Sequence, residues 1–283
     1  MPDTMPMRSA ITICLVPEAR QGPFVFHEGL AAGCRAARAA SFDAVEIFPG
    51  SADDLAVATV GPLLAEHGLA VAAVGTGAGW VRQRLHFCHA DPAVRERAIA
   101  FAGDIVDAAG RLGAPAIIGS MQGQATPEVS RPAAIDLLAE ALSRLGPRAA
   151  SHGQVLLYEP LNRYETNLFN QQADAAAFLR DRRLGNVKLL CDLFHMAIEE
   201  ADVAQALVAC GDLVGHVHWA DSNRRAMGFG HTATAPILAA LERIGYEGCL
   251  SAEVFPLPTP EAAASQTIAS LRPLARDRAG EPA

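Results

Sequence analysis

The chain has 283 residues, a formal net charge of −8 and a hydrophobic fraction of 51%, which is typical of a globular protein with a large buried core. The negative charge argues against nucleic acid as a partner, because phosphate backbones are bound mainly through Lys and Arg. No apolar run is long enough to span a membrane and no apolar leader follows Met1, so we expect a cytoplasmic protein. The six scattered cysteines contain no CxxC pair and indicate neither a disulfide framework nor a zinc ribbon.

Short runs rich in β-forming residues alternate with Ala- and Leu-rich helical stretches along the whole chain. This alternation predicts parallel βα units, and eight of them predict an α/β fold with a closed (β/α)8 TIM barrel as one domain over residues 1–283. A doubly wound open sheet is the alternative. The predicted strands are 11–16, 44–48, 70–75, 116–121, 155–160, 187–192, 215–221 and 249–255. The predicted helices are 27–40, 55–67, 92–112, 131–152, 171–182, 201–210, 233–244 and 260–276.

The ends of the chain and the longest loop lie outside this pattern. We expect residues 1–8 and 278–283 to be flexible extensions. The loop at 75–92 is rich in glycine but lacks the GxGxxG spacing of a phosphate-binding turn. We therefore predict that it covers the barrel mouth as a lid, with Trp80 as a wall of the site.

Polar side chains interrupt apolar strands at their C-terminal ends, where α/β barrels carry their active sites. Glu159, Asp192 and Glu253 end the fifth, sixth and eighth predicted strands, and His218 lies in the seventh. Each carboxylate alone could cap a helix or stabilise a loop. Three of them converging on one barrel mouth would be costly without a cation. The four residues therefore predict one divalent metal ion, Mn²⁺ or else Mg²⁺ or Co²⁺, since these ions prefer oxygen ligands.

Two histidines compete for the metal site, because His216 and His218 point to the same face of one strand. His218 is nearer the C-terminal mouth and is the predicted ligand, whereas His216 is expected to pack deeper in the barrel. Glu46, in the second strand, could form structural hydrogen bonds or contact the substrate. In the stretch from 156 to 165, the residues after Glu159 are expected to face the substrate.

Four segments resemble a known family: EPLNRYE (159–165), DLFHM (192–196), HVHWADSNR (216–224) and AEVF (252–255). Together they are similar to the xylose-isomerase-like barrels, and among these to the ketose 3-epimerases that act on tagatose, psicose or ribulose. The resemblance implies that Glu159, Asp192, His218 and Glu253 bind the metal. It also implies a sugar or keto-sugar substrate and a homodimer or homotetramer.

The resemblance further assigns roles in the reaction. It implies that Glu159 and Glu253 are the two acid/base groups, and that Glu165, His195 and Arg224 hold the substrate oxygens. One carboxylate would remove the proton next to the ketose carbonyl and the other would return a proton to the opposite face of an enediolate. No organic cofactor is needed for this chemistry.

The chain departs from the epimerase pattern at Leu193, where a threonine is usual, and at Asp221, where a glutamate is usual. These changes leave the substrate open. An aldose–ketose isomerase, or a dehydratase or lyase acting on a sugar or cyclitol ketone, would begin with the same proton abstraction. Two further alternatives are a non-catalytic sugar-binding subunit and an endonuclease for abasic sites. The endonuclease would need further histidines after the third and fourth strands, where the segments VGTG and IGSM have none.

Overall fold

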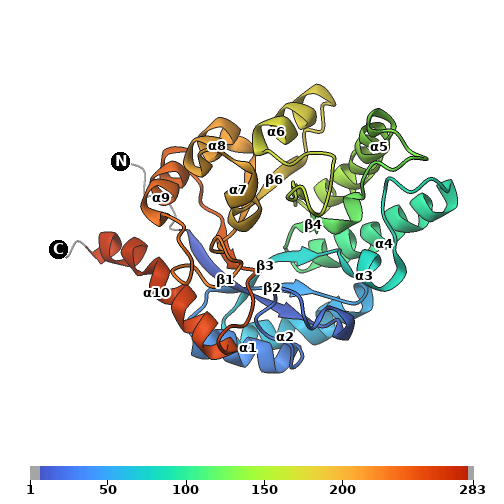
Figure 1. The fold of residues 1–283 in the computed structure, drawn as a ribbon. Helices are drawn as coiled ribbons and strands as arrows, with labels where there is room; N and C mark the ends of the chain where they lie inside the picture. Colours follow the sequence, from blue (N-terminus) through green and yellow to red (C-terminus); the bar gives the residue numbers. More distant parts are fainter. Residues whose placement is uncertain (1–6, 280–283) are drawn as a thin grey trace.

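The computed structural model describes residues 7–279, and the side chains of residues 7–271. Eight parallel strands pair in chain order and close into a barrel (Figure 1), which confirms the predicted fold. The strands are β1 Arg8–Cys14, β2 Ala44–Phe48, β3 Ala70–Gly75, β4 Ala116–Ile118, β5 Leu156–Tyr158, β6 Val187–Asp192, β7 Val214–His218 and β8 Cys249–Ala252.

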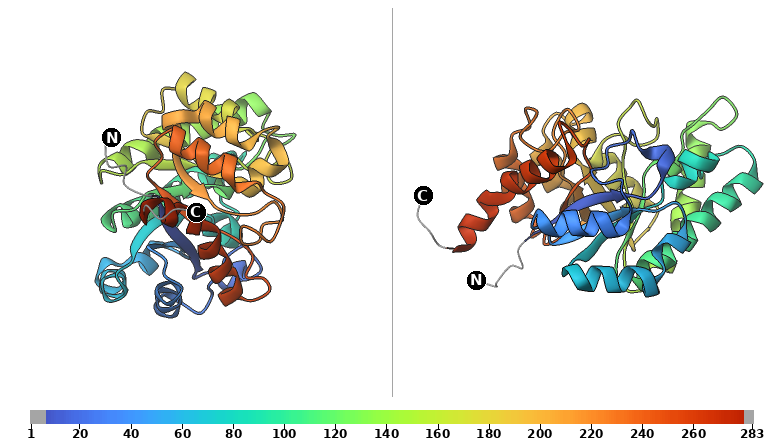
Figure 2. Two further views of the ribbon diagram at one scale, coloured as in Figure 1. Left: turned by 90° about the vertical axis from the view of Figure 1, so that its left-hand side faces the viewer. Right: turned by 90° about the horizontal axis from the view of Figure 1, so that it is seen from below.

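Helices surround the barrel on its outside, as Figures 1 and 2 show. Every predicted helix is present, with ends within three residues of the prediction. None of the described helices is long and apolar enough to cross a membrane. The helices are α1 Leu30–Ala39, α2 Val57–His67, α3 Ala78–Gln83, α4 Pro92–Arg111, α5 Arg131–Ala150, α6 Gln172–Asp181, α7 Leu193–Glu199, α8 Val203–Cys210, α9 Thr234–Arg243 and α10 Pro260–Ala279.

Several strand ends differ from the prediction. β1 begins at Arg8, because its first residues pair with β8 through the register Arg8 to Cys249. The expected flexible extension was therefore wrong for Arg8, which belongs to the barrel, and residues 278–279 lie within α10. The expectation for residues 1–6 and 280–283 concerns residues outside those described. β4, β5 and β8 are shorter than predicted, because the chain leaves the ladder of hydrogen bonds at the mouth.

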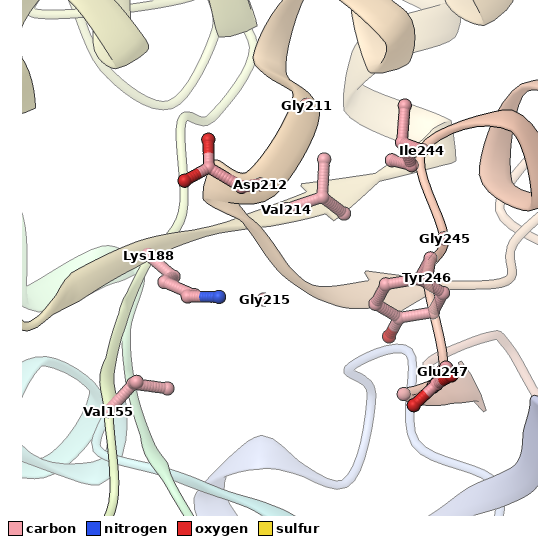
Figure 3. A pocket seen from close by; sticks show the side chains of 11 residues that line it. Val155, Lys188, Gly211, Asp212, Val214, Gly215, Ile244, Gly245, Tyr246 and Glu247 are labelled. Carbon is pink, nitrogen blue, oxygen red and sulfur yellow. The ribbon is translucent and has the colours of Figure 1, made fainter. Parts of the chain in front are cut away.

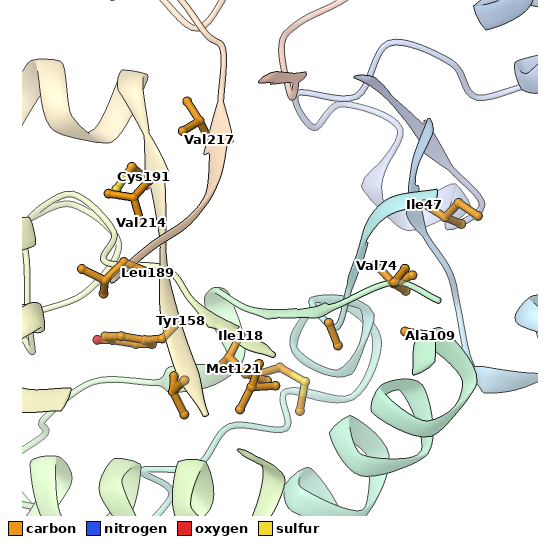
Figure 4. Packing of buried hydrophobic residues seen from close by; sticks show 14 of the residues in the cluster. Ile47, Val74, Ala109, Ile118, Met121, Tyr158, Leu189, Cys191, Val214 and Val217 are labelled. Atoms are coloured by element: carbon orange, nitrogen blue, oxygen red, sulfur yellow. The ribbon is translucent and has the colours of Figure 1, made fainter. Parts of the chain in front are cut away.

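Side chains alternate between two cores along each strand. Outward-facing residues such as Ile47, Val74 and Tyr158 pack against the helices (Figure 4). Inward-facing residues, among them Leu157 and Leu190, fill the barrel interior. Two positions after these lie Glu159 and Asp192, which therefore point inward at the mouth.

The described residues include two short α-helices that were not predicted. α3 lies within the predicted loop at 75–92, and α7 directly follows β6, where the sequence analysis predicted no helix. Asp192 caps α7, because its Oδ1 accepts a hydrogen bond of 2.8 Å from the backbone N–H of Phe194. All six cysteines are buried and free.

The opposite end of the barrel has a cavity of its own, of about 350 Å³ (Figure 3). It is lined by residues at the starts of β6 and β7 and before β8, including Lys188, the only lysine of the chain. This cavity contains none of the predicted site residues, all of which lie at the C-terminal mouth.

Candidate metal centre and active site

The four predicted metal ligands lie together at the mouth of the barrel. Asp192 and His218 are the last residues of β6 and β7, and Glu159 and Glu253 directly follow β5 and β8. One donor atom from each lies within 4.8 Å of all the others. His218 Nδ1 is 3.4 Å from Asp192 Oδ2, 3.6 Å from Glu253 Oε2 and 3.7 Å from Glu159 Oε1. Two ligands that each lie about 2.1 Å from one ion are about 3.0 to 4.2 Å apart, so this spacing fits a metal site.

The electrostatics of the cluster also fit a cation. Burial raises the pKa of Glu159 well above its usual range, and it raises the pKa of Glu253. Burial opposes the ionisation of Asp192 as well, but the neighbouring His195 and His218 hold its pKa below the usual range. A divalent cation would offset the cost of burying these carboxylates in their charged form. Three carboxylates and one imidazole are a donor set that suits a hard divalent ion.

Glu46, on β2, holds the predicted histidine ligand in place. Its Oε1 accepts a hydrogen bond of 3.1 Å from His218 Nε2, and its Oε2 accepts one of 2.8 Å from His216 Nε2. With Nε2 directed at Glu46, Nδ1 of His218 faces the three carboxylates, as in the carboxylate–histidine–metal arrangement of many metal sites. The Glu46, His216 and His218 donor atoms also lie within 4.8 Å of one another, but they are hydrogen-bonded to each other.

The three predicted substrate-binding residues border the cluster. His195, on α7, has its Nε2 atom 3.6 Å from Asp192 Oδ2. Arg224 donates a hydrogen bond of 3.0 Å from Nη2 to Glu253 Oε2, and its Nη1 lies 3.6 Å from Glu165 Oε1. The structure therefore brings together all seven residues that the sequence analysis placed in the site.

A buried aspartate organises the loop that presents Arg224. Arg224 has a φ of 58°, a left-handed conformation that is uncommon for residues other than glycine. Its guanidinium lies 4.8 Å from the centre of the Phe194 ring. Asp221 is fully buried, and its carboxylate accepts hydrogen bonds from four backbone N–H groups of the loop. The donors are Ser222, Gly228, Gly230 and Thr232.

The expectation that the residues after Glu159 face the substrate was wrong for two of them. Arg163 points outward and forms a two-point ion pair with Glu199 of α7. Tyr164 is 82% exposed. The reason is a turn, in which the N–H of Glu165 donates to the carbonyl of Asn162, so that successive side chains point in different directions. Asn162 and Glu165 turn inward toward His195, and Leu161 is buried as well.

A cavity of about 370 Å³ lies over the cluster and contains walls that the sequence analysis missed. Trp80 lines it as predicted, and Phe24 and Phe48 add aromatic surface from the first half of the chain. Gly119, just after β4, makes room for Glu159, because a Cβ atom there would lie 2.4 Å from Glu159 Oε2. A glycine directly after a buried strand was the available sequence signal.

Comparison with known proteins identifies the class to which this barrel belongs. The model of the xylose isomerase-like TIM barrel family matches residues 34–274, so the chain belongs to this family. It is 36% identical over 137 residues to L-ribulose 3-epimerase from Methylomonas sp. (strain DH-1), and the match covers 48% of each chain. It is 32% identical over 231 residues to ketose 3-epimerase from Arthrobacter globiformis, covering 81% of this chain and 78% of that protein.

A solved structure agrees with these matches. D-allulose 3-epimerase from Methylomonas sp. superposes with a TM-score of 0.76 and 26% identity, covering 96% of this chain and 99% of that one. The sequence match spans about half of the L-ribulose 3-epimerase from Methylomonas and more than three quarters of the Arthrobacter relative. The resemblance found in the four sequence segments is thus confirmed at the level of the family.

Proposed function

We propose that this protein is a divalent-metal-dependent ketose 3-epimerase. The observation that carries the proposal is the pair of buried glutamates at the barrel mouth. Glu159 and Glu253 come from strands that are three apart in the barrel, and each lies within 3.7 Å of His218 Nδ1. Both have a raised pKa, as expected of groups that exchange protons with a substrate at neutral pH. The ketose 3-epimerase relatives support the same reaction.

Four residues would bind the metal, and two of them would also transfer protons. Glu159, Asp192, His218 and Glu253 would hold the metal, for which Mn²⁺ is our first choice and Mg²⁺ and Co²⁺ are alternatives. When bound, the ion would polarise the ketose carbonyl and acidify the neighbouring C–H group. One glutamate removes the proton from C3, and the other delivers a proton to the opposite face of the enediolate.

The remaining side chains position the sugar. His195, Arg224 and Glu165 offer hydrogen-bonding groups beside the two glutamates, where the substrate oxygens next to the reacting carbon would lie. The aromatic walls Phe24 and Trp80 face the rest of the cavity. Such walls exclude water and hold the carbon chain in a reactive orientation.

The test is an assay with metal-stripped protein that has been reloaded with Mn²⁺. D-allulose, D-tagatose and L-ribulose are supplied separately, and the products are identified by NMR. We expect the C3 epimer only in the metal-loaded sample, and loss of turnover in Glu159→Gln and Glu253→Gln with metal content measured in both. The exposed Glu140→Gln is the matched control and should keep wild-type activity. An aldose product would indicate an isomerase, and a folded, metal-loaded protein that forms no epimer would contradict the proposal.

A further inference from the structure

Asn162 has a buried side chain whose hydrogen bonds are not explained by metal binding or by proton transfer at the two glutamates. It is buried, with 2% exposure. Its Nδ2 lies 2.7 Å from His195 Nδ1 and donates a hydrogen bond of 3.0 Å to Glu165 Oε1. Its Oδ1 accepts a hydrogen bond of 2.9 Å from the backbone N–H of Tyr164. Because a backbone N–H can only donate, the amide oxygen must face Tyr164 and the NH₂ group must face His195.

This arrangement determines which nitrogen of His195 carries the proton. The backbone N–H of Asn162 also points at His195 Nδ1, at 3.3 Å. Two N–H donors converge on Nδ1, so Nδ1 must accept and the proton of the neutral ring must lie on Nε2. Nε2 is buried and has no hydrogen-bond partner among the described residues. It points toward the cluster, 3.7 Å from Glu159 Oε1.

The metal-ligand histidine has the opposite arrangement. His218 directs Nε2 at the carboxylate of Glu46 and turns Nδ1 toward the cluster. A carboxylate partner requires an N–H on the nitrogen that faces it and leaves the other nitrogen able to bind a metal. An amide NH₂ partner requires a lone pair on the ring nitrogen that faces it, so the proton of the neutral imidazole lies on the other ring nitrogen. His218 thus presents a lone pair to the cluster, whereas His195 presents an N–H group to it.

We propose that Asn162 is a positioning residue that keeps His195 a hydrogen-bond donor toward a substrate oxygen and prevents it from becoming a fifth metal ligand. The same amide holds Glu165, so one side chain orients two of the groups around the substrate. The inference rests on the proposed function only in naming a ketose oxygen as the acceptor of the Nε2–H group.

The first experiment measures the tautomer of His195 by ¹H–¹⁵N NMR of metal-free, sugar-free protein labelled at histidine. His195→Gln assigns the signals. We expect the proton on Nε2 in the wild type. Asn162→Asp replaces the donor by an acceptor, so Nδ1 should carry a proton in that variant, whether the ring is neutral or charged. Asn170→Asp is the matched control, because Asn170 lies in the same loop and its Nδ2 donates to the carbonyls of Leu161 and Thr166.

The second experiment measures metal selectivity. If Nδ1 of His195 bonds to a carboxylate, Nε2 becomes available to a metal, and imidazole ligands favour Zn²⁺ over Mn²⁺. Asn162→Asp should therefore raise the ratio of Zn²⁺ to Mn²⁺ affinity by about tenfold or more, while Asn170→Asp leaves it unchanged.

Three results would overturn the inference. They are a proton on Nδ1 in the wild type, an unchanged tautomer and unchanged metal ratio in Asn162→Asp, and equal effects of the two Asn→Asp substitutions. If Asn162→Asp does not fold, the wild-type tautomer still decides. Because the tautomer is measured without metal or sugar, absence of epimerase activity would overturn the proposed function alone. An Nδ1–H tautomer in an active enzyme would overturn this inference alone.

Discussion

Replacing Asp221 by asparagine should destabilise the protein and disturb Arg224. In the folded protein Oδ2 accepts hydrogen bonds of 2.7 Å from the N–H groups of both Gly228 and Gly230. An asparagine that keeps its oxygen toward Ser222 would turn an NH₂ group toward these two donors. Hydrogen bonds to charged groups contribute about 1.5–3 kcal/mol each. Burial opposes the ionisation of Asp221, but the loop N–H groups lower its pKa from 3.8 to about 2, which corresponds to roughly 2 kcal/mol. We expect a loss of about 2–5 kcal/mol at pH 7.

The assay is urea unfolding of wild type and Asp221→Asn between pH 7 and pH 2. A carboxylate whose pKa is lowered by folding contributes its full stability above its unfolded pKa and loses that stability as the pH falls through the folded pKa. The difference between the two proteins should therefore be constant from pH 7 to about pH 5 and shrink between pH 4 and pH 2. Asp212→Asn, at an exposed aspartate, is the control. A loss below 1 kcal/mol at pH 7, or a difference that does not change with pH, would refute the reasoning.

The remaining predictions concern the metal site and its supports. Because burial raises the pKa of Glu159 and Glu253, the metal-free protein should lose stability as the pH rises above about 4.3. Mn²⁺ should therefore raise the melting temperature more at pH 8 than at pH 5. A shift in melting temperature that does not depend on pH would contradict this prediction. Gly119→Ala should displace Glu159 and lower kcat about tenfold or more in folded protein, since about 1.4 kcal/mol of lost transition-state stabilisation suffices for that. An unchanged kcat would show that the close approach of Gly119 to the Glu159 carboxylate does not matter for the reaction. Glu46→Gln should weaken Mn²⁺ binding about 10- to 100-fold in calorimetric titration, because His218 loses its carboxylate partner. Wild-type affinity in this variant would argue against the proposed role of Glu46 in orienting His218.

Much of the fold and the centre of the site could be predicted from local patterns. The alternation of strand and helix gave the eight βα units, because each strand is a short apolar run with its own punctuation. Asp192 ended such a run and His218 lay within one, so their position near the mouth followed from the rule that parallel strands in a barrel share one C-terminal edge.

What the sequence could not predict depends on contacts between distant residues. Glu46 lies on β2, and nothing in its own neighbourhood shows that it bonds to two histidines of β7. The direction of Asn162 depends on a turn, and its partner His195 lies on a helix of only seven residues that is too short to show a helical period. Arg163 was misplaced for the same reason, because its partner Glu199 is at the far end of that helix.

The measurement that tests the proposed reaction most directly is turnover in D₂O by the metal-loaded enzyme. If Glu159 and Glu253 exchange protons with opposite faces of the substrate, the epimerised product should carry solvent deuterium at the reacting carbon. The corresponding glutamine variants, with metal occupancy measured, should be slower by at least about 10²–10⁴. Complete epimerisation without deuterium at that carbon, or near-normal rates in both metal-loaded variants, would contradict the two-glutamate mechanism.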